Sequence, residues 1–219
     1  MKIWVTRTLP EAEATAARVR ERGHEAVVAP VLRARPLAGA GLPLDGVEAL
    51  AFSSAHAVAA FAALSPRRDF AVFTTGAATA ARARQAGFKA VVSADGAADA
   101  LIALVARAHP TRVLHPAAAE PAADIAGRLI ERGIPALAVP VYETVPAPIA
   151  APPPNIDAVL VHSARAAGIV ARLLAEAGAH RLQAFAISES AARPLAALGL
   201  ARLAFAPFPN ETSLLDLLA

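Results

Sequence analysis

The sequence contains no cysteine, which excludes disulfide bonds, thiolate catalysis and cysteine-ligated metal sites. Its six histidines show neither the HxH nor the HxxxH spacing that metal sites commonly use, so we expect no metal. No pair of carboxylates stands out as an acid–base pair. These absences predict a chemistry that depends on positioning the substrate more than on strong acids or bases.

Long hydrophobic runs are also missing. The longest stretch without Asp, Glu, Lys or Arg is 49–66, which contains Ser53, Ser54 and His56 and ends in Pro66. A membrane span would not carry these residues, whereas a buried strand followed by an apolar helix explains them. The N-terminal MKIWVTR begins at once with strand-like alternation, so we expect no signal peptide, no membrane partner and a cytoplasmic location.

Nucleotide and nucleic-acid signatures are absent as well. GAGL at 39–42 does not lie between a strand and a helix, and GxSxG does not occur. The formal net charge is only +3, and the charges are spread along the chain without a basic block. This mild positive balance favours an anionic small molecule over a nucleic acid.

An internal repeat is the most informative feature that is present. RVRERGHEAVVAPV at 18–31 returns as RLIERGIPALAVPV at 128–141. ALAFSSAHA returns as AVLVHSARA, and GAATAARARQAG returns as SESAARPLAALG, in the same order along the chain. The chain therefore has two kinds of segment, which alternate as A (about 1–35), B (about 46–106), A′ (about 112–145) and B′ (about 156–218). They indicate two similar domains with a ligand site in the cleft between them.

Short apolar runs alternate with Ala-, Leu- and Arg-rich segments of helical length. The expected strands are 2–6, 25–29, 47–52, 70–74, 89–93, 112–115, 135–139, 156–161, 183–187 and 201–206. The expected helices are 10–22, 55–64, 77–86, 97–108, 120–132, 164–177 and 189–198. Glycines fall where most of these helices should end, as a left-handed C-cap requires. The alternation predicts an α/β protein with parallel sheets flanked by helices, about five strands to a sheet.

The pairing of the four segments can be read in two ways. In the simpler one, B and A′ form a domain at 39–138, and A joins B′ in a discontinuous domain of 1–33 plus 147–219. Segments 34–38 and 139–146 would then pair as hinge strands, because both are extended and lack helical periodicity. In the rival reading, two consecutive domains divide near residue 110, and periodicity alone does not choose between the two.

Candidate binding residues follow the strands, because parallel α/β sheets bind ligands beyond the carboxyl ends of their strands. Hydroxyl groups and backbone N–H groups at helix N-termini would favour an anion there, although Ser and Thr are also ordinary N-caps. Arg7 could bind a carboxylate through two hydrogen bonds or form a surface salt bridge. The candidate substrate-binding residues are Arg7, Ser53, Ser54, Gly76, Thr79, Ser163, Ser188 and Ser190.

Tyr142 is the only tyrosine, and it lies in VYET on the second expected hinge strand. Its phenol could act as a general acid or hold a leaving hydroxyl group. It could equally pack against the hinge with its hydroxyl in water.

Taken together, these motifs resemble the uroporphyrinogen-III synthase family over nearly the whole chain. The resemblance rests on the opening VTRTLPEAEATAARVRERGHEAVVAPVLRARPL and on FSSAHAV, TTGAATAARARQAGF, VPVYET and AISESAARPLAALG. It implies two similar flavodoxin-like domains, each a parallel five-stranded sheet flanked by helices, joined by a two-stranded hinge. Tyr142 matches the family's hinge tyrosine, which is thought to assist loss of the hydroxyl group.

The resemblance also implies the reaction. The substrate would be the linear tetrapyrrole hydroxymethylbilane, which the enzyme closes into a ring with inversion of ring D and loss of water, without a cofactor. We expect a monomer in tetrapyrrole and heme biosynthesis, in transient contact with hydroxymethylbilane synthase. The alternative is a non-catalytic two-domain clamp for an anionic small molecule, since HPAAAEP lacks the family's Arg-Gly and Ser188 replaces its usual glycine.

Overall fold

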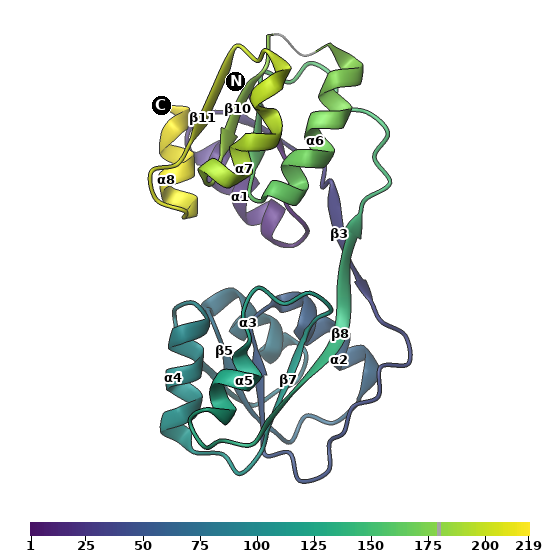
Figure 1. Cartoon of the computed structure of the whole chain (residues 1–219), viewed down its shortest axis with the longest axis vertical. Helices are drawn as coiled ribbons and strands as arrows, with labels where there is room; N and C mark the ends of the chain where they lie inside the picture. Colours follow the sequence, from purple (N-terminus) through teal and green to yellow (C-terminus); the bar gives the residue numbers. More distant parts are fainter. Residues whose placement is uncertain (179–180) are drawn as a thin grey trace. The chain divides into compact units, whose positions relative to one another are not determined.

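The computed structural model describes residues 1–178 and 181–219. The chain forms two compact units, each with its own sheet (Figure 1). Unit 1 comprises Met1–Arg33 and Val145–Ala219, and unit 2 comprises Ala34–Thr144. No helix among the described residues is long and apolar enough to cross a membrane.

Unit 1 is built on a five-stranded sheet in the order β11-β10-β9-β1-β2, with every neighbouring pair parallel. Its strands are β1 (Lys2–Val5), β2 (Glu25–Val28), β9 (Ala158–Val161), β10 (Gln183–Ala186) and β11 (Arg202–Phe205). Its helices are α1 (Glu11–Glu21), α6 (Ala164–Ala177), α7 (Glu189–Ala192) and α8 (Glu211–Leu215), with 3₁₀ turns at Arg193–Leu198 and Asp216–Leu218.

The two faces of this sheet bury different helices. Ile3 and Val5 are fully buried with side chains of α1 and α8, and Trp4 is fully buried with side chains of α6. Successive residues of a strand point to opposite faces, so β1 contributes to both cores. A strand that is buried on both faces explains the unbroken apolar run at 3–5.

Unit 2 has a six-stranded sheet in the order β3-β8-β7-β4-β5-β6. Its strands are β3 (Leu32–Pro36), β4 (Ala49–Phe52), β5 (Ala71–Thr74), β6 (Ala90–Ser93), β7 (Val113–Ala118) and β8 (Ala136–Pro146), and β4 to β8 pair in parallel. Its helices are α2 (Ala55–Leu64), α3 (Ala77–Gln85), α4 (Ala98–Ala108) and α5 (Ile125–Ile130). Side chains of α2 and α3 fill one core, and those of α4 and α5 fill the other.

The α/β class and its parallel sheets are confirmed, but the expectation of five strands in each sheet is wrong for unit 2. The extra strand is β3, which lies beside β8; the Leu37 amide donates to the Val141 carbonyl at 2.9 Å. The second expected hinge strand is also part of a longer strand, since β8 runs without a break from Ala136 to Pro146. The two segments expected as hinge strands, 34–38 and 139–146, therefore extend the unit 2 sheet at its edge.

Glycines end the helices as expected. Gly23, Gly87, Gly133, Gly178 and Gly199 all have positive φ, between 63° and 96°. Gly178 follows α6 with φ 70° and ψ 64°, a left-handed conformation that a residue with a Cβ atom adopts only at a cost.

Candidate functional site

A cavity of about 450 Å³ opens at the carboxyl edge of the unit 2 sheet. This volume is typical of small-molecule sites. We call it the unit 2 cavity. It is lined by Ser53, Ser54, Thr75, Gly96, Ala97, Ala98, Ala118, Glu120, Pro121, Ala122, Ala123, Ile125, Tyr142 and Thr144. Most of these residues follow β4, β5, β6 or β7, where a parallel sheet is expected to bind its ligand.

Ser53 and Ser54 link the end of β4 to the start of α2. Ser54 has extended backbone angles and caps α2, its Oγ accepting from the His56 amide at 3.1 Å. Ser53 is exposed, and its carbonyl accepts from Thr75 Oγ1 at 3.4 Å. The structure therefore brings both predicted serines to the cavity, and the Oγ of Ser54 also serves as a helix cap.

Tyr142 enters the same cavity from β8. Its side chain is only 8% exposed and packs in the core that α2 and α3 cover. Its ring centroid lies 5.6 Å from that of His56, with the rings tilted at 46°. The register of β7 against β8 shifts between Ala117 and Ala118, which brings Ala118 opposite Tyr142. The phenol is therefore held by packing beside the two serines.

Glu120 is the one charged residue among the described residues that line the cavity. It lies in the connection between β7 and α5, and it is exposed. Neither Glu120 nor Thr144 is among the binding residues predicted from the sequence. The expectation that ligands bind beyond the carboxyl ends of the strands also covers the segment after β7. That segment was not selected because it contains no serine or threonine.

Gly76 and Thr79 are not among the residues that line the cavity. Gly76 caps α3 with extended backbone angles, and a Cβ atom there would meet nothing within 4 Å. Thr79 lies inside α3 and is 7% exposed.

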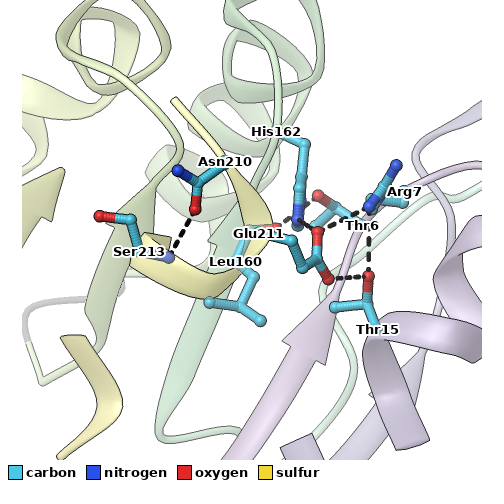
Figure 2. Close-up of polar contacts among 8 residues, drawn as sticks. All are labelled: Thr6, Arg7, Thr15, Leu160, His162, Asn210, Glu211 and Ser213. Carbon is cyan, nitrogen blue, oxygen red and sulfur yellow. Dashed lines mark hydrogen bonds and ion pairs between the residues drawn. The ribbon is translucent and has the colours of Figure 1, made fainter. Parts of the chain in front are cut away.

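In unit 1, Arg7 belongs to a cluster of polar side chains at the carboxyl edge of the sheet (Figure 2). Its Nη1 lies 2.7 Å from Glu211 Oε2. Thr15 donates to Glu211 Oε1 at 2.5 Å, and His162 Nε2 lies 3.1 Å from Oε2. We call Arg7, Thr15, His162 and Glu211 the Glu211 cluster; it joins α8 to α1 and to the ends of β1 and β9.

The electrostatics of the Glu211 cluster follow from burial and hydrogen bonding. Burial alone would raise the pKa of Glu211, but hydrogen bonds from His162 and Thr15 and the charge of Arg7 outweigh it and lower the pKa to about 2. Burial also lowers the pKa of His162, against the opposing effect of Glu211. Near neutral pH, an ionised Glu211 therefore accepts from the Nε2–H of a neutral His162, and Arg7 is largely neutralised by its partner.

The remaining candidates in unit 1 are helix caps or lie beside one. Ser163 caps α6, accepting from the Ala166 amide at 3.1 Å. Ser188 caps α7, accepting from the Ala191 amide at 3.3 Å, and its Oγ lies 2.9 Å from that of Ser190. All three follow β9 or β10, at the same edge of the sheet as Arg7.

A larger cavity of about 560 Å³ in unit 1 lies between the Pro152–Pro154 segment and the C-terminal end of α6. It borders Ile156 and Leu182, which precede β9 and β10, so it lies at the amino edge of the sheet. The unit 2 cavity is the better candidate because it lies at the carboxyl edge of its sheet, where parallel α/β sheets bind their ligands.

Comparison with known proteins gives a family match over almost the whole chain. The family model for uroporphyrinogen-III synthase HemD matches residues 13–216. A search of curated proteins gives no match. The structure of uroporphyrinogen-III synthetase from Helicobacter pylori aligns with a TM-score of 0.64 at 16% identity, over 99% of this chain and 97% of that one. A mutant uroporphyrinogen III synthase from Thermus thermophilus gives a TM-score of 0.48 at 18% identity, over 99% and 96% of the two chains.

Proposed function

The chain belongs to the uroporphyrinogen-III synthase family, and we propose that Tyr142 and the hydroxyl groups of the unit 2 cavity carry its reaction. The enzyme cyclises hydroxymethylbilane to uroporphyrinogen III, with inversion of ring D and loss of water, in heme biosynthesis. The family match covers both units, so a non-catalytic clamp is not favoured.

One observation supports this assignment most directly: the phenol of Tyr142 and the side chains of Ser53 and Ser54 line one cavity. Loss of the substrate's hydroxyl group requires a proton donor at that oxygen, and a phenol can supply one. Hydroxyl groups around it can hold the leaving oxygen through hydrogen bonds. Because Tyr142 is packed against the core, it loses little conformational freedom when the substrate binds.

For the substrate's carboxylates we propose contacts with Arg7, Ser163, Ser188 and Ser190 in unit 1, and with the N-terminus of α3 at Gly76 and Thr79 in unit 2. Helix N-termini favour anions by about 0.3–1 kcal/mol each, so several can hold a polycarboxylate without many cationic side chains. Arg7 already neutralises Glu211, so its attraction for a substrate carboxylate is weaker than that of an isolated guanidinium group.

We also propose that the enzyme is a cytoplasmic monomer that receives its substrate in transient contact with hydroxymethylbilane synthase. Free hydroxymethylbilane closes spontaneously to the type I isomer, so a short exposure to water would preserve the yield of type III.

The experiment is an isomer assay. Hydroxymethylbilane is supplied, the products are oxidised to porphyrins, and the type III and type I isomers are separated by chromatography. We expect mainly type III above the spontaneous type I background. Tyr142→Phe should lower kcat by about 10²–10⁴ without unfolding the protein, as expected for removal of a general acid. If the folded wild type yields only type I, the synthase assignment is wrong; if Tyr142→Phe retains full turnover, Tyr142 has no part in the mechanism.

A further inference from the structure

The charge of the unit 2 cavity differs from that of a carboxylate-binding site. Among the described residues that line it, Glu120 is the only charged one and no Lys or Arg is present. The substrate carries many carboxylates, which a Glu side chain repels. The same substrate also carries pyrrole N–H groups, for which a carboxylate is a strong hydrogen-bond acceptor. The cavity therefore suits a pyrrole ring better than an acidic side chain.

We propose that the unit 2 cavity binds the hydroxymethyl-bearing pyrrole ring and that Glu120 is a catalytic residue, its carboxylate accepting a hydrogen bond from the N–H group of that ring. This inference rests on the proposed function of Tyr142. It assigns the two ionisable side chains of the cavity to opposite ends of one reacting group: Tyr142 to the leaving oxygen and Glu120 to the pyrrole nitrogen.

The chemistry of water loss explains why a carboxylate is useful there. The bond between the methylene carbon and oxygen breaks, and its electron pair leaves with the oxygen, which takes the proton of Tyr142 and departs as water. The nitrogen lone pair delocalises onto the methylene carbon, so the ring gains one positive charge and Tyr142 is left as a phenolate. The proton that the substrate loses on ring closure then restores the phenol, and atoms and charge balance.

Positive charge therefore develops on the ring that the carboxylate of Glu120 contacts. A negative group at the N–H stabilises this charge in the transition state more than it stabilises the neutral substrate, which is the condition for raising kcat. The N-terminus of α4 adds backbone donors for the leaving oxygen, because Ala97 and Ala98 line the cavity and α4 has no side-chain cap; the Gly96 amide already donates to the Thr75 carbonyl.

The size of the effect is limited by solvent. Removal of one preorganised group that stabilises transition-state charge typically costs about 10²–10³ in kcat. Glu120 is exposed, so water and salt screen part of its field, and we expect a loss of about 10- to 100-fold.

The test compares Glu120→Gln and Glu120→Asp with the wild type in the isomer assay. Glu120→Gln retains the shape and an acceptor oxygen but removes the charge, so kcat should fall about 10- to 100-fold while KM changes less than about threefold. Glu120→Asp should recover part of kcat. Glu131→Gln removes an exposed carboxylate that follows α5 and lies outside the cavity lining, and should leave kcat and KM unchanged.

A double-mutant cycle with Tyr142→Phe adds a readout that a structural role would not change. Because both groups act on one step, the double variant should lose less than the product of the two single losses. Wild-type kcat in Glu120→Gln, an effect on KM alone, or fully multiplicative losses would overturn the role of Glu120. If the wild type forms only type I, the proposed function itself fails, whereas type III formation by a fully active Glu120→Gln refutes this inference alone.

Discussion

Replacing Glu211 by Gln tests whether the Glu211 cluster stabilises unit 1 through an ionised carboxylate. The variant keeps the size of the side chain and can still accept a hydrogen bond from Thr15. It can no longer neutralise Arg7, whose Nη1 lies 2.7 Å from the native carboxylate. We therefore expect a loss of stability that depends on charge rather than on packing.

The magnitude follows from the pKa of Glu211, which is lowered from 4.5 to about 2. A shift of this size corresponds to about 3 kcal/mol of stability at neutral pH. Part of this is screened by solvent, so we expect Glu211→Gln to cost about 1–2 kcal/mol. Because the folded-state pKa is the lower one, this stability is present above pH 4.5 and is lost as the pH falls toward 2. By pH 3.5 the folded protein should have lost roughly two-fifths of the stability that the ionised carboxylate provides at neutral pH.

The assay is urea unfolding followed by tryptophan fluorescence at neutral pH and at about pH 3.5. Trp4 is the only tryptophan, lies buried in β1, and donates to the Ala29 carbonyl at 2.7 Å, so its emission reports on unit 1. Glu25→Gln is the matched control, because Glu25 forms an exposed pair with Lys2 at 3.5 Å and should cost less than about 0.5 kcal/mol. Equal stability of Glu211→Gln and wild type at neutral pH would refute the reasoning, and a deficit of the same size at both pH values would assign it to packing.

Two further predictions concern His115 and Ser163. Burial lowers the pKa of His115, so below pH 6.5 the unfolded chain binds a proton that the folded state does not, and stability should fall as the pH drops from 7 to 5. His115→Asn can keep a hydrogen bond to the Ala51 carbonyl and should flatten this pH dependence in circular dichroism melts. An unchanged slope would contradict the assignment. Ser163→Ala should lower the free energy of unfolding by about 1 kcal/mol, because α6 loses its cap. Ser163→Asp should keep the cap but raise KM, because its carboxylate repels those of the substrate. An unchanged KM in folded Ser163→Asp would remove Ser163 from the binding residues.

Most strands could be predicted from the sequence because each is a short apolar run between helical segments. The β3 strand was missed as a sheet member because LRARP alternates with charges and has no continuous apolar run. The helix expected at 189–198 is α7 followed by a 3₁₀ turn, since Pro194 has no amide hydrogen to donate within a helix. The helix α8 was not predicted because its five residues are too few to show a period.

The sequence predicted only those parts of the candidate site that follow a repeated strand or lie on the distinctive VYET segment. Ser53, Ser54 and Tyr142 were selected because they follow a strand or lie on a distinctive one, and the structure brings them to one cavity. Sequence offered no reason to join Arg7 to Glu211, because their contact depends on where a short C-terminal helix packs. Thr144 belongs to the same VYET segment as Tyr142 but was not selected with it, and Glu120 lies in an irregular connection after β7 that carries no hydroxyl group.

The order of strands in unit 1 also has a consequence for synthesis on the ribosome. Strand β1 lies between β2 and β9, and Ile3 is in register with Ala158. At roughly 5–20 residues per second, the first strand waits on the order of ten to thirty seconds for this neighbour to be made. Residues 34–144 can finish their own sheet during that interval. The growing chain therefore carries the apolar β1-α1-β2 unit, with one edge of β1 unpaired, until late in translation, and this is the stage at which a chaperone would be of most use.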